Sequence, residues 1–209
     1  MNDYRNTKYC PIYEKIADKK QALETEIEKN HQVQDLYKII SPNEGTTYKQ
    51  KFMRIYNNKC CYCGVSLPII SKPLFEIDHF RNKKHVAFAT EAEAGTMENL
   101  VLSCRKCNRA KSGFIIDDDD YEKLYPDDGS IAKSFSRDDK FYIVVATGKQ
   151  NDDKIQAFYK KLKLNEEVRR LDYLLMNMMG LKEKLIDKPD IQNLLGRAID
   201  RLLEKRSMM

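Results

Sequence analysis

The sequence predicts an α+β protein with short strands in the middle of the chain and helices on both sides. Residues 11–40 and the stretch from 152 onward space their apolar side chains at three and four positions, as helices do. The central stretches 66–80 and 97–113 mix extended patterns with turn residues. Two C-x2-C pairs frame these central stretches, and such pairs commonly close a metal site in a loop-rich core.

Two helices are expected before the first cysteine pair. Residues 11–40 contain no internal Gly or Pro, Pro11 suits a first helical turn, and Ser41-Pro42 marks a stop. The apolar residues of this stretch are Ile12, Ile16, Leu23, Ile27, Val33, Leu36 and Ile40. A second helix is predicted over 46–58, with Phe52, Ile55 and Tyr56 facing inward.

The middle of the chain reads as a turn, a strand or hairpin, and a strand leading into a helix. CCYCG (60–64) predicts a tight turn because a glycine follows the cysteines directly. SLPIISKPLFEIDHF (66–80) predicts a strand or hairpin, and its two prolines forbid long regular pairing. MENLVLSCRKCNRAKSG (97–113) predicts an extended start and then a helix ending near Gly113.

The second half begins with acidic runs and ends in helices. DDDD (117–120) and PDDG (126–129) are interpreted as linker and turn, and FYIVVAT (141–147) as a strand. The chain is expected to be helical again from Asp152, with a last helix after Pro189. The cluster of Met176, Met178 and Met179 favours core packing or a partner surface over a functional role.

Composition indicates a charged globular protein. The 209 residues suffice for one good core, with room for a small appended lobe, and 42 % are apolar against 33 % charged. The first 15 residues lack the apolar core of a secretion signal, and no segment approaches the roughly 20 apolar residues of a membrane helix. We therefore expect a cytoplasmic protein, where paired cysteines more often bind metal than form disulfides.

Positive charge is concentrated in one segment. Residues 49–111 carry 12 basic and 5 acidic side chains, a net of +7, whereas residues 112–139 carry 3 and 9, a net of −6. The basic segment also holds five of the six cysteines. A local positive potential attracts a polyanion such as nucleic acid, and the alternative from charge alone is a solvated basic face.

The cysteine pairs predict a structural zinc site. Cys60 and Cys63 lie on the predicted turn, and Cys104 and Cys107 lie at the start of the predicted helix, 40 residues further on. Four thiolates from two such pairs can close a tetrahedral zinc cage. Cys61 is one residue out of register and Cys10 has no partner, so both are interpreted as ordinary thiols.

Several polar residues lie inside or beside the loop that this zinc would close. Asp78, His79 and Asn99 are inside it, and Asn108 would point about 100° away from Cys107 on a helix, onto a neighbouring surface. Lys111 lies three residues later on nearly the same face. Alone, an Asp-His pair is usually a polar pair at a strand end and an Asn is usually a cap.

The order C-x2-C, D-H, N-L-x-x-x-C-x2-C-N-x-x-K over residues 60–112 resembles the HNH endonuclease motif in its four-cysteine version. Two positions depart from the usual family pattern. Asn82 stands where a proline is common, and Asn108 stands where histidine is common, although many active relatives also carry asparagine.

The resemblance implies a ββα-metal fold and hydrolysis of nucleic-acid phosphodiesters with one divalent ion. His79 would be the general base, Asp78 and Asn108 would hold Mg²⁺ or Mn²⁺, and Asn99 would hold the histidine and its loop in place. Charge and position make Arg81, Arg105, Arg109 and Lys111 candidates for phosphate contacts. Glu76 is interpreted as a surface strand residue, and His31 and His85 as solvent-facing side chains.

This assignment makes a structural demand. Asp78 and His79 are neighbours, so in a regular strand they would point to opposite faces of the sheet. One shared site therefore requires irregular backbone at 78–80, at a strand end or a bulge.

The predicted organisation is an N-terminal helical arm (1–48), a nuclease core (49–115), and an acidic linker, short strand and helical region (116–209). The leading hypothesis is a metal-dependent endonuclease cutting DNA. The alternatives are a zinc-stabilised nucleic-acid binding module without activity and a partner-docking subunit. Residues 133–147 and 157–175 are similar in general pattern to the region after the nuclease core in HNH proteins of bacterial anti-phage defence. These proteins include the nuclease subunits of Septu-type and retron-linked systems, which are paired with an ATPase. The similarity therefore implies an ATPase partner for this chain.

Overall fold

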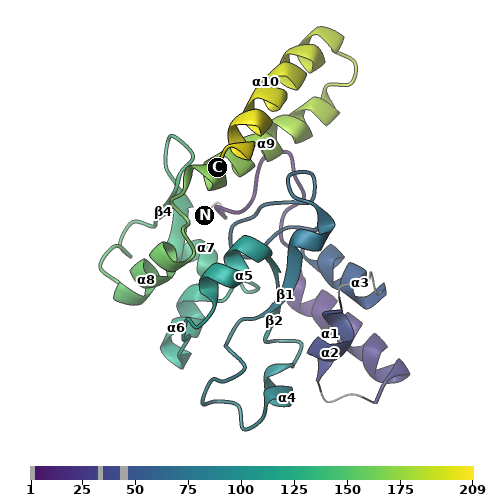
Figure 1. The fold of residues 1–209 in the computed structure, drawn as a ribbon, viewed down its shortest axis with the longest axis vertical. Coiled ribbons are helices and arrows are strands. Elements are labelled where there is room, and N and C mark those ends of the chain that lie inside the picture. The colour runs from purple at the N-terminus through teal and green to yellow at the C-terminus, as the bar shows by residue number, and fades with distance from the viewer. Residues whose placement is uncertain (1–2, 33–34, 43–46) are drawn as a thin grey trace.

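The computed structural model describes residues 3–32, 35–42 and 47–209, and its centre is a two-stranded hairpin with a helix packed on it (Figure 1). Strands β1 (Phe75–His79) and β2 (Leu100–Cys104) pair antiparallel, and α5 (Arg105–Lys111) follows β2 directly and packs against both. The mixed α+β class predicted from the sequence is confirmed.

The turn that carries the first cysteine pair lies against the second strand. The Cys61 backbone N–H donates to the Leu102 carbonyl at 2.8 Å, and the Gly64 N–H donates to the Cys60 carbonyl at 2.9 Å. Gly64 has φ +80°, and a Cβ there would lie 2.5 Å from the carbonyl oxygen of Arg5, so both the turn and the N-terminal segment require glycine. The predicted tight turn is confirmed.

The N-terminal region is more broken than its apolar spacing predicts. Helix α1 covers Ile16–Asn30, and a separate short helix, α2, covers Leu36–Ile40. His31 is extended, with φ −143° and ψ 133°, so the prediction of one helix over 11–40 is wrong. Val33 lies outside the described residues, as does residue 46 of the second predicted helix. That helix is α3 (Thr47–Ile55), and the three residues expected to face inward are buried.

The segments before and after β1 contain only short helical turns. A 3-10 turn at Lys72–Leu74 leads into β1, so only the last part of 66–80 is strand. The long connection from β1 to β2 contains α4 (Glu91–Ala94).

The acidic run is a helix rather than a linker. Helix α6 covers Asp118–Leu124, and its start forms a capping box in which Asp117 and Asp120 each bond the other's backbone N–H. Acidic side chains stabilise a helix N-terminus because they satisfy free N–H groups and oppose the helix dipole. The PDDG segment (126–129) bends as the predicted turn, with Gly129 at φ +82°, but the side chain of Asp127 is only 3 % exposed.

Beyond α6 lie α7 (Ser130–Ser134), a second antiparallel pair of strands, and three helices. Strand β4 (Ile143–Val145) is the core of the predicted strand at 141–147, and it pairs with β3 (Phe135–Arg137), which the sequence did not indicate. Helices α8 (Asp153–Lys161), α9 (Glu167–Lys184) and α10 (Pro189–Ser207) confirm the predicted helical end, and α9 and α10 form a hairpin that projects from the body (Figure 1).

One continuous cluster of buried apolar side chains includes residues from the N-terminal helices, the central hairpin and the C-terminal helices. Met176 belongs to it, and Met178 and Met179 pack against it, as expected of core residues. The division at 48/49 and 115/116 stays a prediction. Among the described helices none is both long and apolar enough to cross a bilayer.

Candidate metal centre and active site

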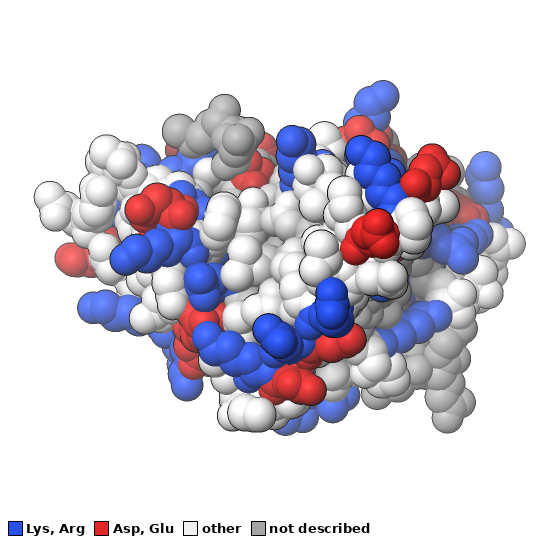
Figure 2. Space-filling view, turned by 90° about the horizontal axis from the view of Figure 1, so that it is seen from above, with Lys and Arg blue, Asp and Glu red and all other residues white. Residues whose placement is uncertain are grey.

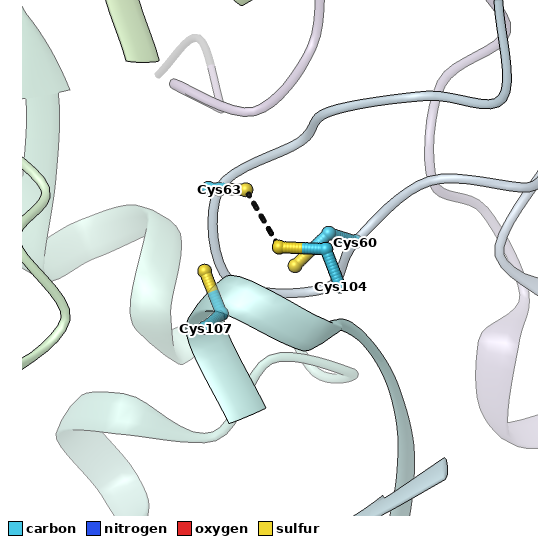
Figure 3. A group of neighbouring side chains, drawn as sticks. All are labelled: Cys60, Cys63, Cys104 and Cys107. Atoms are coloured by element: carbon cyan, nitrogen blue, oxygen red, sulfur yellow. Dashed lines mark hydrogen bonds between the residues drawn. The ribbon is translucent and has the colours of Figure 1, made fainter. Parts of the chain in front are cut away.

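Four cysteine sulfurs converge between the turn at 60–63 and the N-terminus of α5 (Figure 3). Cys60, Cys63, Cys104 and Cys107 are buried, and their Sγ atoms all lie within 4.8 Å of one another. The Sγ atoms of Cys63 and Cys104 are 3.9 Å apart, too far for a disulfide. In a tetrahedron with Zn–S bonds of about 2.3 Å, sulfurs are about 3.8 Å apart. The predicted cluster is confirmed, and its donor set and spacing fit zinc.

The other two cysteines stand apart from this cluster. Cys61 is fully buried, and burial raises the pKa of its thiol well above the usual range, which disfavours a thiolate. Cys10 is half-buried and its Sγ lies 3.5 Å from the carbonyl oxygen of Met176.

Asp78 lies on the face of β1 that α5 covers, and its carboxylate is fully engaged. The Nζ atom of Lys111 is 3.0 and 3.2 Å from the two carboxylate oxygens and also donates to the backbone carbonyl of His79 at 2.8 Å. The Tyr62 hydroxyl donates to Asp78 at 2.7 Å. Both members of the Asp78–Lys111 ion pair are buried.

Glu76 is two residues earlier on the same face and takes the amide of Asn108. The Nδ2 atom of Asn108 donates to Glu76 at 2.8 Å, and the Arg105 guanidinium donates to the other carboxylate oxygen at 2.8 Å. Asn108 therefore faces away from the cysteine cluster, as its position after Cys107 predicts. Glu76 is three-quarters buried rather than a plain surface residue.

His79 points to the other face of the hairpin. Its ring packs on the Tyr37 ring of α2 with centroids 4.4 Å apart, whereas Asp78 contacts Lys111 and Tyr62. Partial burial lowers the pKa of His79 below its usual 6.5, against the opposing effects of Asp78 and Asp35.

The irregular backbone expected at 78–80 is wrong for Asp78 and His79. Asp78 pairs with Val101 and His79 with Leu100 in regular register, and the Phe80 N–H still donates to the Asn99 carbonyl at 2.7 Å. The chain bends only at Phe80 and beyond. Regular pairing directs neighbouring side chains to opposite faces of the strand, but the Asp78 carboxylate is still close enough to act on the charge of His79.

Asn99 fastens the segment that follows His79. Its Oδ1 accepts from the Arg81 N–H at 2.8 Å, and its Nδ2 donates to the carbonyls of Arg81 at 3.0 Å and Ala94 at 2.8 Å. The side chain is buried and bonds both ends of the long β1–β2 connection. This connection therefore leaves the hairpin in one defined direction.

The four basic residues considered for phosphate contacts differ in accessibility. Arg81 pairs with Asp118 at 2.7 Å, and Arg105 is bonded to Glu76. Lys111 is buried and its ammonium group is engaged by Asp78 and the His79 carbonyl, so it is not accessible to a phosphate. Arg109 is exposed. Figure 2 shows basic side chains interspersed with acidic ones on the face seen from above, rather than a field of one sign.

The two remaining histidines also differ. His31 is exposed, as predicted. The prediction that His85 faces solvent is wrong, because its side chain is 8 % exposed and its Nε2 lies 3.6 Å from an oxygen of Asp117.

The hairpin offers oxygen ligands for a hard cation, but their arrangement does not fit one. Asp78, Glu76 and Asn108 carry the oxygen atoms that Mg²⁺ prefers. The Lys111 ammonium already lies against Asp78 and the His79 carbonyl, and Asn108 is bonded to Glu76. A divalent ion held by Asp78 would compete with the Lys111 ammonium for the carboxylate oxygens, whereas Asn108 meets Glu76 through Nδ2 and would bind an ion through Oδ1.

This hairpin and helix, joined to a four-cysteine cluster, can be compared with known families. Residues 60–114 match the HNH endonuclease family. The resemblance seen in the motif is thereby confirmed over this HNH segment, which is about a quarter of the chain.

A curated relative supports the same conclusion. The SPbeta prophage-derived protein YoqL of Bacillus subtilis (strain 168), which bears the name of an HNH endonuclease, is 29 % identical over 69 residues. The match covers 33 % of this chain and 30 % of the relative. No solved structure matches the chain significantly. Neither match names an ATPase partner or a defence system.

Three residues around the site were not singled out from the sequence. Tyr62 lies inside the first cysteine pair, and its contact with Asp78 depends on how the turn docks on the sheet. Tyr37 belongs to a short helix that the apolar spacing merged with its neighbour. Arg169 lies 62 residues after Cys107 and contacts its sulfur, and no local pattern indicates this.

Proposed function

We propose that the chain is an endonuclease that hydrolyses phosphodiester bonds of DNA, with His79 as the general base. One observation carries the proposal. The segment that matches HNH endonucleases places a half-buried imidazole at the end of β1, beside a connection fastened by Asn99.

The environment of His79 suits a base. Because burial lowers its pKa below 6.5, the ring is neutral at neutral pH and has a nitrogen free to accept a proton from water. The contact with Tyr37 restricts the ring, and the bonds from Asn99 to Arg81 fix the backbone just beyond it. General base catalysis of this kind typically contributes about 100- to 10,000-fold in rate.

Asp78 and Asn108 are the proposed ligands of a divalent ion, Mg²⁺ or Mn²⁺. The Lys111 ammonium lies against both oxygens of Asp78, so ion binding there must displace Lys111, whereas Asn108 can keep its Nδ2 bond to Glu76 and offer Oδ1. The defence role and the ATPase partner stay predictions from the sequence.

A non-catalytic nucleic-acid binding module is the second candidate. The internal pairing of Asp78 and Asn108 favours it, because an HNH fold whose acidic ligand is held by a lysine has no open cation site. Arg109 and the exposed side chains Lys160, Lys161 and Lys163 would then contact phosphates without cleavage.

Cleavage assays separate the two candidates. Purified protein is incubated with plasmid, linear duplex and single-stranded DNA and with RNA, in Mg²⁺, Mn²⁺ or EDTA, at one ionic strength. The nuclease proposal expects DNA cleavage with a divalent ion and none in EDTA. Binding to DNA with no turnover in any ion would support the binding module and contradict the nuclease.

A further inference from the structure

Arg169, in the first turn of α9, places its guanidinium among the cysteine sulfurs. One terminal nitrogen lies 3.3 Å from Sγ of Cys63 and 4.0 Å from that of Cys104, and the other lies 3.2 Å from Sγ of Cys107. The arginine is 2 % exposed. It comes from the C-terminal helices, outside the segment that matches the HNH family.

The charge of this arginine needs a partner. Within the described part of the chain no carboxylate forms an ion pair with it. Two acidic side chains on its own helix pair elsewhere, Glu167 with Arg170 and Lys205, and Asp172 with Arg206 at 2.5 Å. A buried guanidinium with no counter-charge would be strongly destabilising. Four thiolates around one Zn²⁺ carry a formal net charge of about −2, which supplies that counter-charge.

The contact also joins two parts of the cage. Cys63 belongs to the turn before β1, and Cys107 lies on α5 after β2. The planar fork of an arginine can donate to both sulfurs at once, whereas a lysine ammonium is a single point charge. Donors to the ligands of a metal fix their orientation and raise metal affinity.

We propose that Arg169 is a positioning residue for the zinc cage, donating N–H···S bonds to one ligand of each C-x2-C pair, and that it makes docking of α9 and α10 depend on zinc. Without the ion nothing fixes Cys63 and Cys107 at the spacing at which one guanidinium contacts both sulfurs. By linkage, docking of α9 raises zinc affinity to the same extent as zinc stabilises docking.

The test compares zinc retention in Arg169→Gln, Arg169→Lys and the control Arg170→Gln. Arg170 is the next residue on α9 and bonds Glu167 and the Lys140 carbonyl rather than the cage. The readouts are the rate of zinc release to a chromogenic chelator and the sulfur-to-metal absorption bands of the Co²⁺-substituted protein. These bands respond to the hydrogen bonds and the geometry at the sulfurs, and Arg170→Gln controls for a change on α9 that leaves the contacts with the sulfurs in place.

We expect R169Q to release zinc about 10- to 100-fold faster and to shift the Co²⁺ bands, with R169K in between and R170Q like wild type. Wild-type release and unchanged bands in R169Q would overturn the proposal. If R169Q does not fold, the Co²⁺ bands of R169K test the two-sulfur contact, because a lysine keeps the positive charge but can reach one sulfur only. Wild-type bands in R169K would then count against the two-ligand contact.

A second measurement addresses docking in the wild-type protein. Limited proteolysis with zinc bound should leave the segment between α8 and α9 intact, and removal of zinc by a chelator should expose it to cleavage. Equal protection of this segment with and without zinc would contradict the coupling.

Discussion

Removal of the Asp127 carboxylate should be among the most destabilising single changes in the chain. Asp127 accepts from Nζ of Lys20 at 2.5 Å, from the Tyr56 hydroxyl at 2.9 Å and from the Tyr125 hydroxyl at 3.3 Å. The side chains of Lys20 and Asp127 are 4 % and 3 % exposed. This cluster joins α1, the residue that follows α3 and the turn after α6, so its loss affects three separate parts of the core.

The magnitude can be worked from this burial. Asp127→Ala leaves the Lys20 ammonium buried without its counter-charge, which costs about 3–5 kcal/mol in a buried ion pair. The two hydroxyls lose an acceptor as well, although such costs do not add in full. At a urea dependence of about 2 kcal/mol/M, the unfolding midpoint should fall by about 2 M.

The assay is equilibrium unfolding in urea, with zinc held constant. Asp139→Ala is the matched control, because Asp139 is exposed and should change the free energy of unfolding by no more than about 0.5 kcal/mol. The double variant Lys20→Met/Asp127→Asn removes both charges and should recover part of the loss. A cost below about 1 kcal/mol for D127A, or no recovery in the double variant, would refute the buried ion-pair argument.

Three further predictions concern buried polar groups. Burial lowers the pKa of Lys59 from 10.5 to about 8, so the folded state releases this proton first and stability rises with pH between about 8 and 10.5. Lys59→Met should therefore raise the free energy of unfolding at pH 7 by up to about 3 kcal/mol, seen as a higher urea midpoint, and this difference from wild type should shrink by about pH 10. A difference that does not change with pH would contradict this. Asn99→Ala removes the side-chain bonds to Arg81, so the Arg81 amide should exchange faster with deuterium while zinc content stays at wild type; unchanged exchange would count against the fastening role. Lys111→Ala should cost about 3–5 kcal/mol because Asp78 loses its buried partner, and Mg²⁺ should raise the thermal midpoint of this variant more than that of wild type. Equal shifts would exclude Asp78 as an ion ligand in the absence of substrate.

The central hairpin, its zinc cage and α5 could be predicted because each depends on short-range chemistry. The spacing within each cysteine pair, the Gly64 turn and the Asn108 direction are all set within a few residues. The direction of Asp78 and His79 follows from strand alternation alone. A shared site predicts irregular backbone at 78–80, but Asp78 and His79 keep the regular register because strand alternation is set locally.

Other features depend on contacts between distant segments and were missed for that reason. The DDDD run looks like a solvated linker by charge, but its carboxylates cap α6 and Asp120 binds Lys154 at 2.7 Å. Strand β3 has three residues, too few for a periodic signal. Arg169 meets the cysteines only through the docking of α9.

DNA hydrolysis by the HNH segment, with His79 as the base, is the proposal that a single substitution can test. The most direct test is the single-turnover rate of DNA cleavage by His79→Ala, measured beside wild type at equal zinc content. We expect a rate about 100- to 10,000-fold lower with unchanged zinc, and a loss of about 0.5–1.5 kcal/mol in the free energy of unfolding from the lost contact with the Tyr37 ring. Cleavage by His79→Ala at the wild-type rate would contradict it.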